Sequence, residues 1–183
     1  MKRNGVNGII IDRDNCLCYP NDVKVLPHLL DSWNECLDTF GNKNCFILSN
    51  SAGTPNDPSQ IQVSCLYLSS FSYLYVIQAN LLSRNTNVNV LLHSKPKPSL
   101  SIKKPLNEIF GNDLSNLAFI GDRLLTDIYL ANRLNAISIH TTNLYGNDTV
   151  GEKFGRYIEN TLIKNTINDK HDYLDCIRVK TMT

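Results

Sequence analysis

Hydrophobic runs alternate with amphipathic segments along most of the chain. Uninterrupted apolar runs such as "GIII" predict strands that are buried on both faces. Between them, apolar residues recur at helical spacing, as Leu30, Trp33 and Leu37 do before the helix-ending Gly41. We expect strands at 8–11, 45–51, 88–93, 117–122 and 136–140, and helices at 26–41, 124–134 and 151–166.

Strands that alternate with helices predict an α/β fold, with a Rossmann-like parallel sheet and helices on both of its faces. The length of 183 residues suits one domain spanning 1–183, and no segment indicates a large cap. In such sheets ligands bind beyond the carboxyl ends of the strands. The residues that directly follow each strand are therefore the first candidates for a functional site.

Polar side chains lie at the carboxyl ends of four of the predicted strands or directly after them. Each group by itself is typical of a solvated surface turn. Together, at one edge of a parallel sheet, they indicate a site, because their chemistry is complementary. In chain order they are Asp12 and Asp14, Ser49 and Asn50, Lys95 and Lys97, and Asp122 with Asp127.

These residue types suit phosphate chemistry. Asp12, Asp14 and Asp122 together could bind one Mg²⁺, which prefers a few carboxylates and keeps waters for phosphate oxygens. One strand-end carboxylate can attack phosphorus. The carboxylate two residues on, which an extended backbone would place on the same side, can protonate the leaving oxygen. A serine hydroxyl and a lysine would hold the phosphate oxygens.

The order of these motifs resembles that of the haloacid dehalogenase (HAD) superfamily. The residues within these motifs are more similar still to one branch of HAD subclass IIIA. "DRDNC" followed by "CYP" is similar to the "DKDNC...P" opening of the mitochondrial phosphatidylglycerophosphate phosphatases of fungi and plants. "SNSAGT", "HS" before "KP", and "GDRLLTDI" followed by "AN" continue the resemblance, which covers residues 8–140.

The resemblance implies a role for each motif residue. Asp12 would be the nucleophile and Asp14 the acid/base, with Ser49 and Asn50 binding phosphate. Mg²⁺ would bind Asp12, the main-chain carbonyl of Asp14, and Asp122, with Asp127 in support. The implied reaction removes the phosphate of phosphatidylglycerophosphate to give phosphatidylglycerol, a step towards cardiolipin. The implied location is the matrix side of the inner mitochondrial membrane.

The lysine motif departs from the family, which has adjacent lysines before proline. Here Pro96 separates Lys95 from Lys97. The spacing to the following "NEIFG" favours Lys97 as catalytic and phosphate-binding lysine, with Lys95 as the alternative.

An uncharged apolar segment at about 63–78, "VSCLYLSSFSYLYVIQ", is an atypical insertion relative to the family. Four interpretations stay open. It is nearly long enough to span a membrane, although its serines oppose this. It could be an interfacial helix in contact with lipid or a small cap. It could also be a translated intron, because joining "SQIQ" to "ANLLSRN" restores a helix like that of the family.

Composition and charge limit the kinds of partner and of metal or disulfide site that we expect. A net charge of +1 gives no global field that would attract nucleic acid, and nothing indicates an obligate protein partner. The six cysteines form no CxxC pair, so neither a zinc site nor a disulfide framework is expected. The start "MKRNGVNG" is too short for a transit peptide before the first strand.

The expected partner is an anionic phospholipid at a membrane surface. A local basic patch could serve this substrate and would comprise Lys95, Lys97, Lys103, Lys104 and Arg123. Two alternatives remain: a phosphatase for a soluble phosphomonoester, and an inactive scaffold that binds phosphorylated ligands. The intact set of aspartates opposes the scaffold.

Overall fold

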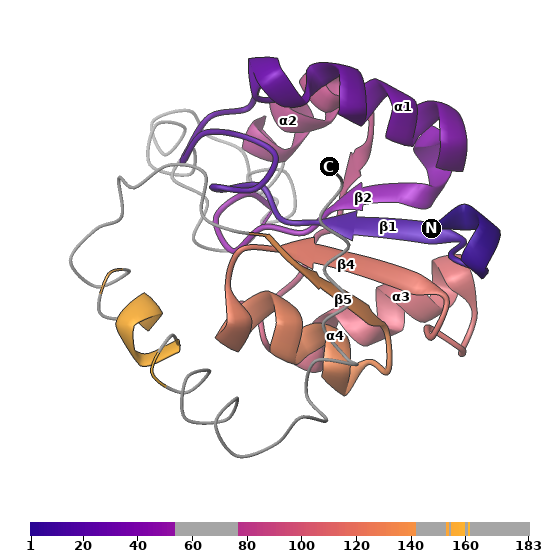
Figure 1. Ribbon diagram of the computed structural model, residues 1–183, viewed down its shortest axis with the longest axis vertical. Helices are drawn as coiled ribbons and strands as arrows, with labels where there is room; N and C mark the ends of the chain where they lie inside the picture. The colour runs from indigo at the N-terminus through magenta and orange to yellow at the C-terminus, as the bar shows by residue number, and fades with distance from the viewer. Residues whose placement is uncertain (54–76, 142–152, 154, 160, 162–183) are drawn as a thin grey trace, which may run out of the picture.

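The computed structural model of the chain describes residues 1–53, 77–141, 153, 155–159 and 161 (Figure 1). Within these residues a five-stranded sheet is surrounded by four labelled helices. The strands are β1 (Gly8–Ile11), β2 (Cys45–Ile47), β3 (Asn89–Val90), β4 (Leu117–Gly121) and β5 (Ile137–His140). The helices are α1 (Leu30–Phe40), α2 (Ile77–Thr86), α3 (Lys103–Phe110) and α4 (Tyr129–Arg133).

The sheet is parallel throughout, in the order β3-β2-β1-β4-β5. The first strand, β1, lies at its centre, where Ile10 is in register with Phe46 on one side and Phe119 on the other. The chain therefore moves outward from β1 in one direction, then returns and moves outward in the other. The point where this direction reverses, between the carboxyl ends of β1 and β4, is where such sheets bind ligands.

Helices cover both faces of the sheet, as the sequence predicts (Figure 1). On one face, α1 and α2 pack through Trp33, Leu37 and Leu82 against Ile9 and other buried residues of the strands. On the other face, Leu106 of α3 and Leu130 of α4 pack against Ile10, Phe46 and Phe119. The central strand is apolar on both sides because it has a hydrophobic layer on each. The predicted Rossmann-like α/β fold is confirmed.

Several predicted boundaries were wrong. The strand expected over 45–51 ends at Ile47, because the Ser49 hydroxyl accepts the N–H groups of Ser51 and Ala52 and starts a turn. The strand expected over 88–93 is reduced to Asn89–Val90, an edge strand that pairs only with β2. The helices α2 and α3 were not among those expected from the hydrophobic pattern, although α2 contains the segment "ANLLSRN" that one interpretation of the insertion made helical.

The helix expected over 124–134 is present but begins with a π-helical turn, Leu124–Ile128, before α4. In this turn the N–H groups of Asp127 and Ile128 both donate to the main-chain oxygen of Arg123, at 2.9 and 3.3 Å. The helix expected over 151–166 is helical at 153, 155–159 and 161, the part of it that the structure describes.

Most of the predicted insertion at 63–78 lies outside the described residues, as does the part of the chain where a cap would be inserted. The prediction of one domain over 1–183 also extends past residue 161, where the described residues end. Among the described helices, none combines the length and the hydrophobicity that crossing a membrane requires. Four of the cysteines, Cys16, Cys18, Cys36 and Cys45, lie in the described part of the chain and are free thiols there.

Candidate active site

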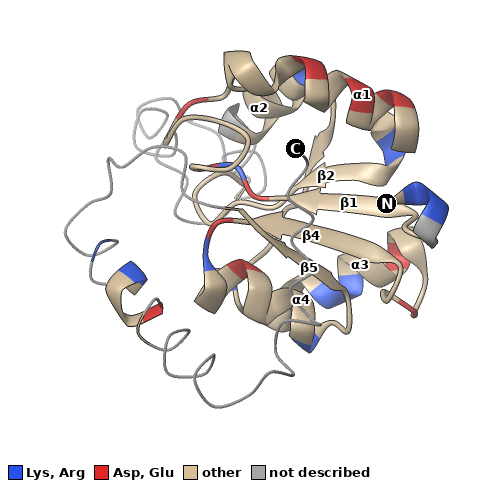
Figure 2. Cartoon of the chain, viewed as in Figure 1, with Lys and Arg blue, Asp and Glu red and all other residues tan. Residues whose placement is uncertain are grey.

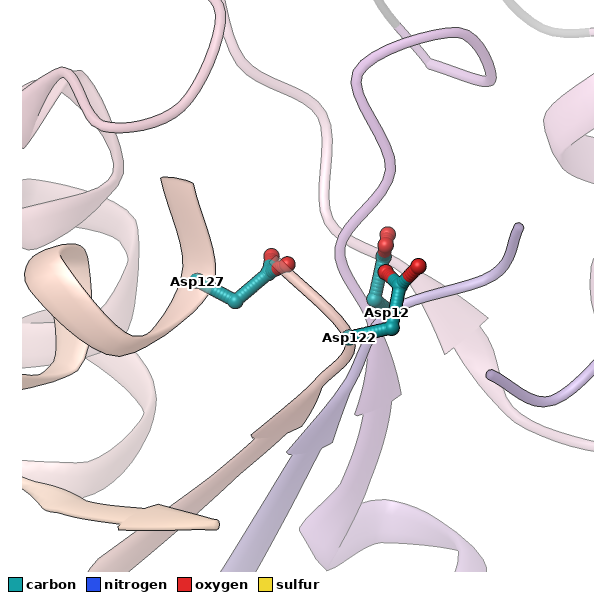
Figure 3. Close-up of side chains that lie close together, drawn as sticks. All are labelled: Asp12, Asp122 and Asp127. Atoms are coloured by element: carbon teal, nitrogen blue, oxygen red, sulfur yellow. The ribbon is translucent and has the colours of Figure 1, made fainter. Parts of the chain in front are cut away.

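Three buried carboxylates meet at the carboxyl ends of β1 and β4 (Figure 3). Asp12 follows β1 and Asp122 follows β4, while Asp127 reaches across from the π-helical turn. One oxygen from each carboxylate lies within 4.8 Å of the others. Oxygen ligands so close together are suited to a hard cation such as Mg²⁺.

Asp127 can approach this point because β4 ends in a glycine. A Cβ atom on Gly121 would lie 2.4 Å from Cβ of Asp127 and 2.5 Å from its Cγ, closer than such atoms pack. The carboxylate of Asp127 also accepts the N–H of Arg123 at 3.2 Å, which joins the turn to the end of the strand. Gly121 is therefore a packing requirement of the acidic group.

Lys97 connects two of the carboxylates. Its ammonium donates to Asp12 at 2.7 Å and to Asp127 at 2.5 Å, and also to the main-chain oxygen of Leu48 at 3.0 Å. Lys97 is buried whereas Lys95 is exposed, so the structure places Lys97 and not Lys95 in the site. The main-chain N–H of Lys97 donates to Asn50, and this bond fixes the lysine loop to the loop after β2.

Burial controls the ionisation of these groups. It raises the pKa of Asp12; the Lys97 ammonium opposes this effect and the Asp127 carboxylate adds to it. Burial by itself would lower the pKa of Lys97, but the attraction of Asp12 and Asp127 outweighs it and raises that pKa. Burial also raises the pKa of Asp122, against the effect of Arg156. Lys97 therefore stays charged, and a bound cation would favour ionised Asp12 and Asp122.

The carboxylate of Asp14 is held apart from this group of three. The Arg13 guanidinium donates to both of its oxygens at 3.0 Å, and the Ser51 hydroxyl and the Asn21 N–H also donate to it, at 2.9 and 2.8 Å. The extended backbone expected between Asp12 and Asp14 does not form, because β1 ends at Ile11 and Arg13 already lies in a turn.

The two phosphate-binding candidates after β2 are both engaged in local bonds. The Ser49 hydroxyl is fully buried and lies 3.0 Å from that of Ser51. Since the Ser51 proton goes to Asp14, Ser49 is the donor in this pair. Asn50 accepts the N–H of Lys97. Both residues lie at the predicted edge, where they join the lysine loop and Asp14 to the end of β2.

Two arginines of the site were missed by the sequence analysis. Arg13 is fully buried against Asp14, and Arg156 donates to Asp122 from a segment 34 residues further along the chain. A cationic residue between two site aspartates was a usable signal for Arg13. No local signal marks Arg156. Figure 2 shows the result: the strands carry no charged residue, and charges of both signs meet where β1 and β4 end.

The predicted basic patch does not form as expected. Lys97 is buried between carboxylates, and Arg123 is paired with the buried Glu159 at 3.2 Å. Lys95, Lys103 and Lys104 are exposed, the last two in the first turn of α3. Of the five residues of the patch, these three are the ones presented to solvent.

Comparison with known proteins gives the family. The sequence profile of the family described as "Mitochondrial PGP phosphatase" matches residues 1–144, which include every strand and every aspartate discussed above. The chain belongs to this family. The predicted resemblance is therefore confirmed.

Curated relatives align with most of the chain. It is 30% identical over 138 residues to "Phosphatidylglycerophosphatase GEP4, mitochondrial" of Saccharomyces cerevisiae, an alignment that covers 73% of this chain and 65% of that protein. It is 30% identical to "Probable phosphatidylglycerophosphatase, mitochondrial" of Schizosaccharomyces pombe, and this alignment covers 79% of this chain and 63% of that protein. It is 32% identical to "Phosphatidylglycerophosphate phosphatase 1, chloroplastic" of Chlamydomonas reinhardtii, with 85% of this chain and 50% of that protein covered. The chain thus spans between 50% and 65% of the length of these relatives.

Replacing Lys97 by alanine is expected to destabilise the protein by about 3–5 kcal/mol, since it leaves Asp12 and Asp127 buried without their cation. Urea unfolding in the presence of EDTA measures this change. Lys95→Ala is the matched control and should stay within about 0.5 kcal/mol of wild type, because Lys95 is exposed. Equal unfolding midpoints for the two variants would contradict the central role given to Lys97.

Replacing Gly121 by alanine is expected to cost about 1–3 kcal/mol, because the new methyl group overlaps Asp127 and displaces either the strand end or the π-helical turn. The same urea titration measures the loss. Divalent-cation binding should weaken as well, since Asp127 is one of the three grouped carboxylates. A variant as stable as wild type would mean that the turn tolerates the methyl group.

Proposed function

We propose that this protein is a Mg²⁺-dependent phosphatase that removes the terminal phosphate of phosphatidylglycerophosphate. One observation carries the proposal: Lys97 binds Asp12 and Asp127 in a buried group with Asp122, as a phosphotransfer site of its family would require. The relatives are named as phosphatidylglycerophosphatases, and these names suggest the substrate. Two of them are named mitochondrial, which supports a mitochondrial location. The inner membrane, on its matrix side, is the location that we propose within the organelle.

The residues present fit a divalent cation. Asp12, Asp122 and Asp127 together bring three buried carboxylates against one ammonium, Lys97, and one guanidinium, Arg156. If all are ionised, the group keeps an uncompensated negative charge in a buried place, which a cation would neutralise. Mg²⁺ would bind Asp12, Asp122 and the main-chain carbonyl of Asp14, with Asp127 in support, and would supply positive charge to the phosphate oxygens.

The proposed reaction begins at Asp12. One of its carboxylate oxygens attacks phosphorus, the bond from phosphorus to the lipid glycerol oxygen breaks, and an aspartyl-phosphate forms. Asp14 gives its proton to the departing glycerol oxygen. In the second step Asp14 takes a proton from water, the water oxygen attacks phosphorus, and inorganic phosphate leaves as the Asp12 carboxylate is restored.

The remaining residues act on charge and position. Lys97 would offset the charge that develops on the phosphoryl oxygens and would keep Asp12 ionised for attack. Ser49 and Asn50 would bind the phosphate once Ser49 exchanges its bond to Ser51 for one to a phosphate oxygen. Asp14 would likewise exchange part of its contact with Arg13 for the leaving oxygen. An anionic phospholipid head group at a membrane surface is the partner that this chemistry serves.

The direct test is hydrolysis by the purified protein. With Mg²⁺ it should release phosphate from phosphatidylglycerophosphate in detergent micelles, with phosphatidylglycerol identified by mass spectrometry, and EDTA should abolish the release. Asp12→Asn should remove activity because the amide is not a nucleophile towards phosphorus. Soluble phosphomonoesters serve as comparison substrates. Equal or faster hydrolysis of these would favour a soluble substrate, and activity retained by Asp12→Asn would contradict the nucleophile.

Asp14→Asn is expected to slow turnover by about 100-fold or more while leaving KM within a few-fold, because proton transfer is lost and phosphate binding is not. Steady-state kinetics on the lipid measures both constants. The asparagine cannot accept from Arg13 with both atoms as the carboxylate does, so folding is checked by circular dichroism. An unchanged turnover number would assign the proton transfer to another group.

A further inference from the structure

A helical segment beyond the family match lies against the acidic group. The match ends at residue 144, yet residues 153, 155–159 and 161 are helical and contribute contacts to Asp122 and Arg123. In Figure 1 this segment, in orange, lies on the side of the sheet toward which the strands point. Some contacts of this site therefore come from residues outside the matched region.

Glu159 attaches the segment to the turn that carries Asp127. It is 3% exposed, and its carboxylate accepts from the guanidinium of Arg123 at 3.2 Å and from the N–H of Leu125 at 3.3 Å. Gly155 permits a close approach, since a Cβ atom there would lie 2.8 Å from the Arg123 guanidinium. A buried ion pair and a glycine contact thus define where the segment lies.

Arg156 extends from this segment to Asp122. Its guanidinium donates to the carboxylate at 2.5 Å and to the main-chain oxygen of the same residue at 3.2 Å. Residues three apart share a helix face, so Arg156 and Glu159 approach the π-helical turn together. The two bonds to one residue fix both the backbone of Asp122 and the rotation of its carboxylate.

We propose that Arg156 is a positioning residue that holds Asp122 in the orientation in which it binds the divalent cation. The proposal rests on the proposed function, which makes Asp122 a cation ligand. The guanidinium engages Oδ2, so Oδ1 is the oxygen left for the cation. Groups that hydrogen-bond a metal-binding carboxylate change metal affinity by about 10–100-fold when removed, because the free carboxylate no longer points at the metal.

Charge by itself would give the opposite effect. A guanidinium close to three carboxylates repels a cation, so an arginine that merely neutralises Asp122 would weaken binding, and its removal would strengthen it. Removing Arg156 should therefore lower the affinity for Mg²⁺ if the arginine orients Asp122, and raise that affinity if the arginine only repels the cation. Lysine at the same position keeps the charge but cannot make the same paired bonds.

Isothermal titration with Mg²⁺ alone, on the full chain, tests the proposal without any substrate. The variants are Arg156→Gln, Arg156→Lys and Glu159→Gln, with Lys153→Gln as the matched control because Lys153 is an exposed residue of the same segment. Arg156→Gln should bind Mg²⁺ about 10–100-fold more weakly. Arg156→Lys should lie between it and wild type, Glu159→Gln should weaken binding in the same direction, and the control should match wild type.

The outcomes are distinct. Unchanged or tighter binding in Arg156→Gln, with wild type binding normally, overturns the positioning role and leaves the proposed function intact. Wild-type affinity in Arg156→Lys also overturns it, since charge without the paired bonds would then suffice. Absence of Mg²⁺ binding in wild type overturns the proposed function and this inference together. Melting temperatures in EDTA confirm folding, and if Arg156→Gln does not fold, the titration of Arg156→Lys decides.

Discussion

The ammonium of Lys97 sits between two carboxylates that would otherwise repel each other in a buried place. Asp12 comes from the end of the central strand and Asp127 from a turn more than a hundred residues later, and the lysine reaches both. Burying an ionised carboxylate costs several kcal/mol unless a cation is paired with it, so each of these two carboxylates needs a cationic partner. The convergence of three chain segments at one edge of the sheet depends on this cation.

The same principle extends to the rest of the site. Each aspartate that the sequence singles out has a cationic partner: Lys97 serves Asp12 and Asp127, while Asp14 pairs with Arg13 and Asp122 with Arg156. A fold that brings four carboxylates to one edge needs such pairing to remain stable. The pairs also fix where each carboxylate points. Stability and the orientation of the carboxylates are therefore consequences of one set of contacts.

The cationic partners of the aspartates differ in whether they lie inside the region that the family profile matches. Lys97 and Arg13 lie inside the matched region of 144 residues, whereas Arg156 lies beyond it. The strand ends that carry the aspartates lie inside the region that the family profile matches, and the helical residues 153, 155–159 and 161 lie outside it.

The sequence by itself determined the α/β fold, the edge of the sheet that bears the site, and the aspartates that lie there. Hydrophobic periodicity is local, and in a parallel sheet it decides which residues follow a strand. Tertiary structure decided the rest. Lys97 rather than Lys95 is buried because it meets Asp12 across 85 residues, and Arg156 reaches Asp122 across 34. Asp14 accepts hydrogen bonds from Arg13, in the turn that follows the end of β1 at Ile11. Spacing along the chain favoured Lys97 but left Lys95 open. The pairings themselves depend on side-chain direction after a turn and on the approach of distant segments, which spacing does not encode.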